Sequence, residues 1–290
     1  MDEFAIDKKL MRRAFNRAAA GYDAAAVLQR EICMRMLERL EYIKLQPERI
    51  LDAGSGTGWG TRRLAQRYPA AQVIALDIAI GMLQAAQGRS SWWQKLFGGT
   101  KQMQVCGDIE ALPLAAKSVG MVWSNLAVQW CNDLPATFAE LHRVLKVDGL
   151  LMFSTFGPDT LKELRQAFNG VDGHNHLNRF ADMHDIGDML VHSGFAEPVM
   201  DMEYLTLTYD EVRGVLQDLK AIGAHNATSG RARGLTGKNA WARLVENYER
   251  LRSNGKLPAT FEVVYGHAWK PQPRMTKEGE AIIRTPFKLK

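Results

Sequence analysis

The sequence predicts an α/β fold with a mostly parallel, seven-stranded sheet and helices on both faces. Three observations predict it. Apolar runs alternate with amphipathic helical patterns between residues 49 and 155, an order that is typical of parallel sheets. A glycine-rich turn follows the first apolar run, and acidic residues end three successive runs. With 290 residues, 46% of them hydrophobic, the chain can bury such a core and also carry an insertion.

The first half of the chain contains the expected lid and most of the sheet. Residues 1–45 have helical patterns with a break at Gly21-Tyr22, and we expect them to form a lid that precedes the first strand. Strands are predicted near 49–53, 72–77, 102–106, 119–124 and 149–155, and helices near 59–68, 79–87 and 135–146.

The remainder of the chain is expected to complete the sheet around an insertion. Two runs, 199–209 and 260–269, alternate between polar and apolar residues, which favours a final antiparallel pair. The residues between them are too many for a hairpin loop and contain helical patterns near 210–222 and 236–253. The predicted organisation within one domain is a lid at 1–45, a cofactor-binding core at 46–208, a helical insertion at 209–259, and a last strand with a basic tail at 260–290.

The turn after the first strand reads Asp52-Ala53-Gly54-Ser55-Gly56-Thr57-Gly58. Glycines there permit positive φ angles and close approach of a ligand to the main chain. A dinucleotide-binding G-x-G-x-x-G motif fails because Trp59 takes the place of the third glycine, and the Lys-Ser/Thr pair of a phosphate-binding loop is absent. The anionic Asp52 suits a cation, such as the amino group of S-adenosylmethionine, whereas it would repel a pyrophosphate. The alternative is a glycine turn that only closes a βα unit.

Two further carboxylates follow the next strands. Asp77 can accept hydrogen bonds from both ribose hydroxyls, and Asp108 from the adenine amino group, while Ile109 packs on the ring. A lone Asp after a strand is usually a cap or turn residue, but three at successive carboxyl ends indicate a ligand in the crevice beyond the sheet. The predicted cofactor-binding residues are Asp52, Gly54, Gly56, Gly58, Asp77, Ile78, Met82, Asp108, Ile109 and Asn125.

Residues after the fourth strand are expected to meet the acceptor. Asn125, Gln129 and Trp130 are candidates for its wall, although the spacing of Trp130 equally fits ordinary core packing. Trp92-Trp93 lies in a linker and is either a docking patch or buried at the sheet edge. No metal site is expected, because the spacing of His174, His176, His184 and His192 and the neighbouring aspartates matches no known zinc site.

Composition limits the other classes of function. Cys33, Cys106 and Cys131 are odd in number and far apart, which favours reduced thiols in a cytoplasm. No apolar run approaches 18 residues and no signal sequence is visible, so neither export nor membrane insertion is expected. Basic residues gather at the end of the chain: residues 211–290 contain 15 Lys and Arg against 7 Asp and Glu, and residues 1–210 contain 22 against 25. This excess favours either an acidic partner or a solvated surface, and no aromatic-basic pattern indicates nucleic acid.

Longer motifs carry a family resemblance. The stretches at 14–23 (AFNRAAAGYD), 107–114 (GDIEALPL), 123–131 (WSNLAVQWC), 176–180 (HLNRF) and 219–237, together with the glycine loop, resemble the malonyl-acyl carrier protein O-methyltransferases of biotin synthesis. The likeness covers residues 10–269. It implies a Rossmann-like class I methyltransferase that uses S-adenosylmethionine to esterify the free carboxylate of a malonyl thioester.

The resemblance also implies the acceptor and its residues. The acceptor would be malonyl-acyl carrier protein or malonyl-CoA, with no nucleic acid and no membrane involved. Tyr22, Arg179 and Phe180 are the expected catalytic residues, in which Arg179 orients the carboxylate and Tyr22 and Phe180 shape the pocket. Basic candidates for docking the acidic carrier are Arg231, Arg233, Lys238 and Arg243. The rivals are a related enzyme or assembly factor with another acceptor, and a non-catalytic module on the same fold.

Overall fold

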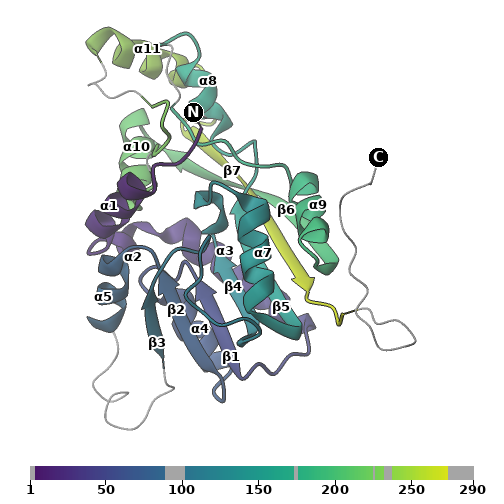
Figure 1. The fold of residues 1–290 in the computed structure, drawn as a ribbon. Coiled ribbons are helices and arrows are strands. Elements are labelled where there is room, and N and C mark those ends of the chain that lie inside the picture. The colour runs from purple at the N-terminus through teal and green to yellow at the C-terminus, as the bar shows by residue number, and fades with distance from the viewer. Residues whose placement is uncertain (1–3, 89–101, 173–175, 225, 232–236, 274–290) are drawn as a thin grey trace, which may run out of the picture.

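The computed structural model describes residues 4–88, 102–172, 176–224, 226–231 and 237–273 (Figure 1). These residues form one seven-stranded sheet in the order β3-β2-β1-β4-β5-β7-β6. Its strands are β1 (Arg49–Ala53), β2 (Gln72–Asp77), β3 (Met103–Cys106), β4 (Val119–Asn125), β5 (Leu145–Phe156), β6 (Ala196–Tyr209) and β7 (Leu257–Trp269). Strands β1 to β5 pair in parallel, and β7 pairs antiparallel with both β5 and β6. The alternating patterns predicted the antiparallel pairing of β6 with β7.

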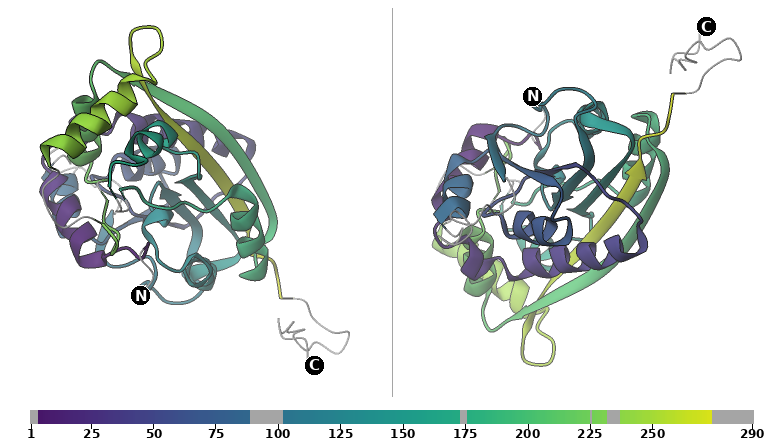
Figure 2. Two further views of the ribbon diagram at one scale, coloured as in Figure 1. Left: turned by 90° about the horizontal axis from the view of Figure 1, so that it is seen from above. Right: turned by 90° about the horizontal axis from the view of Figure 1, so that it is seen from below.

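Helices cover both faces of the sheet (Figures 1 and 2). On one face, α3 (Val27–Arg39) and α4 (Trp59–Arg67) pack on strand residues such as Ile50 and Met121. On the other, α7 (Leu134–Val144) and α9 (Met183–His192) pack on residues such as Leu51 and Val122. Neighbouring strand residues therefore enter different cores, because successive side chains point to opposite faces. Helix α5 (Ile80–Gly88) contacts β2 and β3.

The fifth strand starts earlier than predicted. Leu145 pairs with Val119, and the register then shifts so that Met121 pairs with Leu150. Asp148, with φ +60°, and Gly149 lie within this irregular stretch. Polar residues at a bulge interrupt the apolar run, which is why the pattern indicated only the regular part from residue 149.

The N-terminal residues and the insertion meet above the carboxyl ends of the parallel strands. Helices α1 (Lys8–Ala18) and α2 (Tyr22–Ala25) precede α3, and α10 (Val212–Ala221) and α11 (Lys238–Glu249) lie between β6 and β7. Residues 5–7 pair with residues 227–229: Ile6 forms an antiparallel bridge with Thr228, and the Asp7 N–H donates to the Ala227 carbonyl at 2.9 Å. Segments far apart in the sequence therefore build one cover (Figure 1).

Helix α3 joins this cover to the sheet. Arg35 pairs with Glu203 of β6, and the Tyr265 hydroxyl of β7 donates to the same carboxylate at 2.6 Å. The Arg39 guanidinium lies 3.9 Å from the centroid of the Tyr265 ring. These contacts hold the end of the lid region on the antiparallel edge of the sheet.

Some predictions fall outside the described residues: Trp92-Trp93, His174, Arg233 and the tail from residue 274. Along the part of the chain that the structure describes, no helix is long and apolar enough to span a membrane.

Candidate active site

The glycine loop owes its shape to positive φ angles. Gly54, Gly56 and Gly58 have φ values of +82°, +55° and +76°. The Gly54 and Ser55 N–H groups both donate to the Leu76 carbonyl, at 2.8 and 2.9 Å, so the loop turns over the end of β2. A Cβ on Gly54 would lie 2.2 Å from the Ala127 Cβ. A side chain at this position would therefore displace the loop that follows β4.

The loop borders a pocket beyond the carboxyl ends of β1, β2, β3 and β4. We call this the cofactor pocket. It contains nine residues that the sequence predicted for the cofactor or the acceptor, together with Tyr22: Gly54, Gly56, Asp77, Ile78, Met82, Asp108, Ile109, Asn125 and Trp130. It also contains Lys8, Met11 and Phe15 of the lid. Gly58 does not line it; instead Gly58 is the N-cap residue of α4, and a Cβ there would lie 3.1 Å from the Ala86 Cβ.

Asp77 is held at the pocket by the backbone. Its carboxylate oxygens accept from the Gly56 N–H at 2.9 Å and the Ala79 N–H at 2.8 Å. Burial raises the pKa of Asp77 to about 6, although both backbone bonds oppose this increase. The side chain is therefore mostly ionised at pH 7, and its position is set before a ligand binds.

Asp52 borders a second, adjoining pocket. Its carboxylate accepts from the Thr61 hydroxyl at 2.5 Å and is 2% exposed. Burial, with a contribution from the charge of Asp77, raises the pKa of Asp52 to about 7. Tyr22, Gly54, Gly56 and Asn125 line both pockets, so the two form one elongated site. Burial also raises the pKa of Tyr22, which keeps its hydroxyl neutral at physiological pH.

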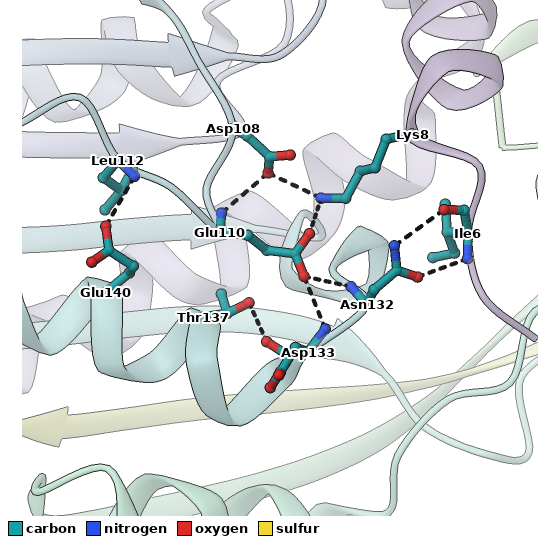
Figure 3. Close-up of polar contacts among 9 residues, drawn as sticks. All are labelled: Ile6, Lys8, Asp108, Glu110, Leu112, Asn132, Asp133, Thr137 and Glu140. Atoms are coloured by element: carbon teal, nitrogen blue, oxygen red, sulfur yellow. Dashed lines mark hydrogen bonds and ion pairs between the residues drawn. The ribbon is translucent and has the colours of Figure 1, made fainter. Parts of the chain in front are cut away.

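Asp108 forms an ion pair with the lid. Its Oδ1 accepts from Lys8 Nζ at 2.9 Å and from the Glu110 N–H at 3.1 Å (Figure 3). Lys8 also pairs with Glu110. Both bonds go to Oδ1, so among the described residues the Oδ2 atom of Asp108 is left to accept from a ligand.

Asn125 links the pocket to the lid and to the sheet. Its side-chain amide donates to the Gln29 carbonyl of α3 at 3.0 Å, and its oxygen accepts from the Ser154 hydroxyl of β5 at 2.9 Å. Next to it, Trp130 packs edge to face with Phe15 of α1, with ring centroids 5.3 Å apart.

Arg179, Phe180 and Gln129 lie together in a neighbouring groove rather than in the cofactor pocket. The groove, which we call the acceptor groove, has an inner part between Phe153 and Ile186 and an outer part that reaches Arg165 and the N-terminal residues Phe4, Ala5 and Ile6. Cys131 lines both parts and also the cofactor pocket, so the two sites adjoin there.

The acceptor groove carries several polar side chains: the guanidinium groups of Arg165 and Arg179, the carboxylates of Asp182 and Asp185, and the amide of Gln129. The Oε1 atom of Gln129 is buried and has no hydrogen-bond partner among the described residues. Arg179 is exposed, and its guanidinium lies 5.8 Å from the Phe4 ring centroid. Phe180 packs edge to face on Phe156, with centroids 5.8 Å apart.

Comparisons with known proteins agree with this geometry. A family model described as "Methyltransferase domain" matches residues 51–153. The chain is 79% identical over its whole length to a malonyl-[acyl-carrier protein] O-methyltransferase of Gallionella capsiferriformans, and the match covers all of that protein. It is 65% identical to one from Nitrosospira multiformis, covering 93% of this chain and 91% of the other. The chain belongs to the malonyl-[acyl-carrier protein] O-methyltransferase family.

Solved structures support the fold alone. A putative methyltransferase from Bacillus halodurans has a TM-score of 0.58 at 17% identity, over 83% of this chain and 99% of the other. The YcgJ protein from Bacillus subtilis has a TM-score of 0.57 at 18% identity, over 82% and 98%. The enzyme is thus a class I methyltransferase, and S-adenosylmethionine is its methyl donor.

The residues present fit that donor. Two buried carboxylates stand at adjoining pockets, and the Gly56 backbone leaves the space in front of Tyr22 free, with the nearest atom 4.0 Å from a Cβ built there. An anion at Asp52 suits a cationic amino group, and Asp77 suits a pair of hydroxyl donors.

Among the lid residues at the site, the sequence predicted Tyr22 but not Lys8, Met11, Phe15, Asn16 and Asp23. Asn16 and Asp23 anchor the lid: Asn16 Oδ1 accepts from the Gly81 N–H at 2.7 Å, and Asp23 accepts from the Thr57 hydroxyl. Both belong to the motif at 14–23, which therefore marked the lid without assigning a task to these side chains. Lys8 carried no such signal, because a lysine at a helix start is ordinary.

Proposed function

We propose that this enzyme transfers the methyl group of S-adenosylmethionine to the free carboxylate of malonyl-acyl carrier protein, an early step of biotin synthesis. The main support is the acceptor groove, which meets the cofactor pocket at Cys131 and carries Arg179. The names of the relatives support the same acceptor. Malonyl-CoA is the smaller alternative, because it presents the same carboxylate.

The cofactor, when bound, supplies an electrophilic methyl group on a sulfonium. Asp52 would hold its amino end, Asp77 its ribose, and Asp108 and Ile109 its adenine. Tyr22 stands between the two pockets and shields the reacting centre from water. No general base is required, because a malonyl carboxylate is already ionised at pH 7 and is itself the nucleophile. The neutral Tyr22 hydroxyl can donate a hydrogen bond but does not need to remove a proton.

Catalysis then depends on alignment. Holding the carboxylate oxygen in line with the methyl group can supply roughly 7–11 kcal/mol of the barrier. Arg179 orients the carboxylate by a bidentate pair, and Phe180 and Trp130 limit its freedom. Because Arg179 is exposed, it can hold the anion without removing all of its nucleophilicity.

The basic end of the chain supports the carrier as partner. Lys238 and Arg243 are exposed on α11, which packs against α8 (Lys162–Phe168), the helix that carries Arg165 of the acceptor groove. Arg231 lies beside the N-terminal residues of the same groove. An acidic carrier would be attracted to this end. We propose that the enzyme works in the cytoplasm, consistent with its three free cysteines.

Intact-mass spectrometry tests the proposal. Malonyl-acyl carrier protein is incubated with enzyme and S-adenosylmethionine, with acetyl-acyl carrier protein as the control that lacks a free carboxylate. We expect a methyl-sized gain on the malonyl form alone. If neither carrier form gains mass while the enzyme still binds the cofactor, malonyl-acyl carrier protein is not the acceptor. That result would favour a related methyltransferase with a different acceptor. Absence of both binding and transfer would favour a non-catalytic module.

Arg179→Met tests the assignment of the carboxylate-binding residue. We expect KM for malonyl-acyl carrier protein to rise roughly tenfold or more, because one bidentate pair is lost. The control is Lys162→Met, which removes an exposed charge on α8 outside the groove lining. An unchanged KM for the Arg179 variant would assign the carboxylate to another residue.

A further inference from the structure

The N-terminal segment, residues 4–8, lies between the two sites. Phe4, Ala5 and Ile6 line the outer acceptor groove, and Lys8 lines the cofactor pocket. Asp7, between them, caps α1: its carboxylate accepts from the Lys9 and Leu10 N–H groups, both at 3.0 Å. The cap fixes the start of α1 directly after the residues that line the groove.

On the cofactor side, Lys8 bridges two carboxylates. It lies 2.9 Å from Asp108 Oδ1 and also pairs with Glu110, and all three side chains are between 20% and 31% exposed. Burial alone would lower the pKa of Lys8, but its bonds to Glu110 and Asp108 outweigh that effect and raise the pKa. Lys8 is thus a charged, doubly paired group on the residue assigned to the adenine.

On the groove side, Asn132 holds Ile6 by two bonds. The Ile6 N–H donates to Asn132 Oδ1 at 2.7 Å, and the Asn132 amide donates to the Ile6 carbonyl at 3.1 Å (Figure 3). This pairing resembles a strand contact made by a side chain, and it places the Ile6 backbone beside the loop after β4.

Glu110 joins these two sets of bonds. One oxygen pairs with Lys8, and the other accepts from the Asn132 and Asp133 N–H groups at 2.7 and 2.9 Å. An unbroken chain of polar contacts therefore leads from Asp108 through Lys8 and Glu110 to Asn132 and Ile6 (Figure 3).

We propose that the N-terminal segment couples the two sites, with Lys8 as a positioning residue, so that cofactor binding raises the affinity for the acceptor. The inference rests on the proposed function. A cofactor in this pocket would contact Asp108, Met11 and Phe15 and would therefore stabilise α1 in the position seen here. In this position Phe4, Ala5 and Ile6 form part of the groove wall. A ligand that favours one of two positions favours every site formed in that position, and the coupling is reciprocal.

Binding measurements without turnover test the coupling. The affinity for malonyl-acyl carrier protein is measured by titration calorimetry with and without S-adenosylhomocysteine, which cannot donate a methyl group. For the wild type we expect S-adenosylhomocysteine to raise the affinity for malonyl-acyl carrier protein by roughly fivefold or more. In Lys8→Met we expect the ratio of the affinities with and without S-adenosylhomocysteine to fall below about twofold. Lys9→Met is the matched control, an exposed lysine one position along the same helix, and should behave as wild type.

A second variant covers the case in which Lys8→Met does not fold. Glu110→Gln retains an acceptor for the Asn132 and Asp133 N–H groups but removes the charge that pairs with Lys8, so the ratio should again fall. Combining both substitutions should add little to either alone, because they act on one contact.

The outcomes separate this inference from the proposed function. Two results would overturn the coupling while leaving the proposed function in place, provided that methylation is normal. In the first, S-adenosylhomocysteine does not change the affinity of the wild type for malonyl-acyl carrier protein. In the second, both variants show the same increase in affinity as the wild type. If malonyl-acyl carrier protein is neither bound nor methylated, the proposed function and the coupling both fall.

Discussion

The buried carboxylate of Asp52 lowers the stability of the folded protein once it is ionised. Its unfolded-state pKa is near 3.8 and its folded pKa is about 7. Because the folded pKa is the higher of the two, the associated stability is present below pH 3.8 and is lost as pH rises through about 7. At pH 8 the buried charge therefore opposes folding unless a cation binds beside it.

Asp52→Asn should separate these two effects. Thr61 can still donate to the Asn oxygen, while the charge is gone. At pH 8 and without cofactor, we expect the free energy of unfolding to rise by about 2 kcal/mol, with a smaller gain at pH 5. Urea denaturation at both pH values measures this. A loss of stability at pH 8 would contradict the buried-charge interpretation.

The same substitution should weaken the binding of the cofactor. In the wild type, affinity for S-adenosylmethionine should increase as pH rises from 6 to 7.5, because Asp52 ionises over this range and attracts the ammonium group. In Asp52→Asn we expect affinity to fall roughly tenfold and to lose most of this pH dependence. Titration calorimetry across this pH range gives both quantities. If the affinity depended on pH equally in the two proteins, the ammonium group would not bind beside Asp52.

Gly54 and Gly56 look equivalent in the sequence but differ in their surroundings. A Cβ on Gly54 would collide with Ala127, whereas one on Gly56 would have Tyr22 Cε1 as its nearest neighbour, at 4.0 Å. Gly56→Ala should lose about 1–2 kcal/mol of stability from its positive φ alone. Gly54→Ala should lose clearly more, because the loop after β4 must also move. Thermal unfolding without cofactor compares them, and equal losses would contradict the close contact.

At the scale of elements, the lid is attached by side-chain bonds to backbone groups. The Asn16 side chain of α1 accepts a hydrogen bond from the Gly81 N–H of α5, and the Gln29 carbonyl of α3 accepts one from the Asn125 side-chain amide. These anchors stand around the cofactor pocket, so the position of the lid and the shape of the pocket depend on each other. A helix that carries pocket residues needs such anchors, since its own propensity does not place it.

Asn16→Ala tests one anchor. It leaves the Gly81 N–H without its acceptor, so we expect a loss of about 1–2 kcal/mol in stability and a several-fold weaker affinity for S-adenosylmethionine. Arg17→Ala is the control, because Arg17 is the next residue on the same helix and is exposed. Calorimetry and thermal unfolding measure the two effects. Similar changes in both variants would mean that loss of any α1 side chain, rather than this anchor, is responsible.

At the scale of the whole molecule, charge is unevenly distributed. The basic excess belongs to residues 211–290, whose described part includes α11 beside α8 and the acceptor groove. The pocket residues Asp52, Asp77 and Asp108 are acidic. Under the proposed function, α11 and its neighbours would attract an acidic carrier, while the three carboxylates would attract a cation.

Removing the charges of Arg231, Arg233, Lys238 and Arg243 together should mainly slow carrier association. We expect kcat/KM to fall roughly tenfold at low salt and its dependence on ionic strength to flatten, with kcat for saturating carrier nearly unchanged. Stopped-flow or steady-state kinetics at several salt concentrations measure this. Unchanged rates in the quadruple variant would place the docking surface elsewhere.

The sequence by itself determined which segments form the strands of the sheet, and it predicted the residues on the cofactor side of the site. Apolar runs report burial directly, and Gly54, Gly56, Asp77 and Asp108 follow strands whose carboxyl ends must share one edge. Only the tertiary structure decided that Lys8 and Asn16 reach this edge, that Asp52 and Asp77 line adjoining pockets, and that Arg179 stands in a neighbouring groove. These relations join residues far apart in the chain, and no local pattern encodes the distance between them, because packing of α1 and the insertion against the sheet brings them together.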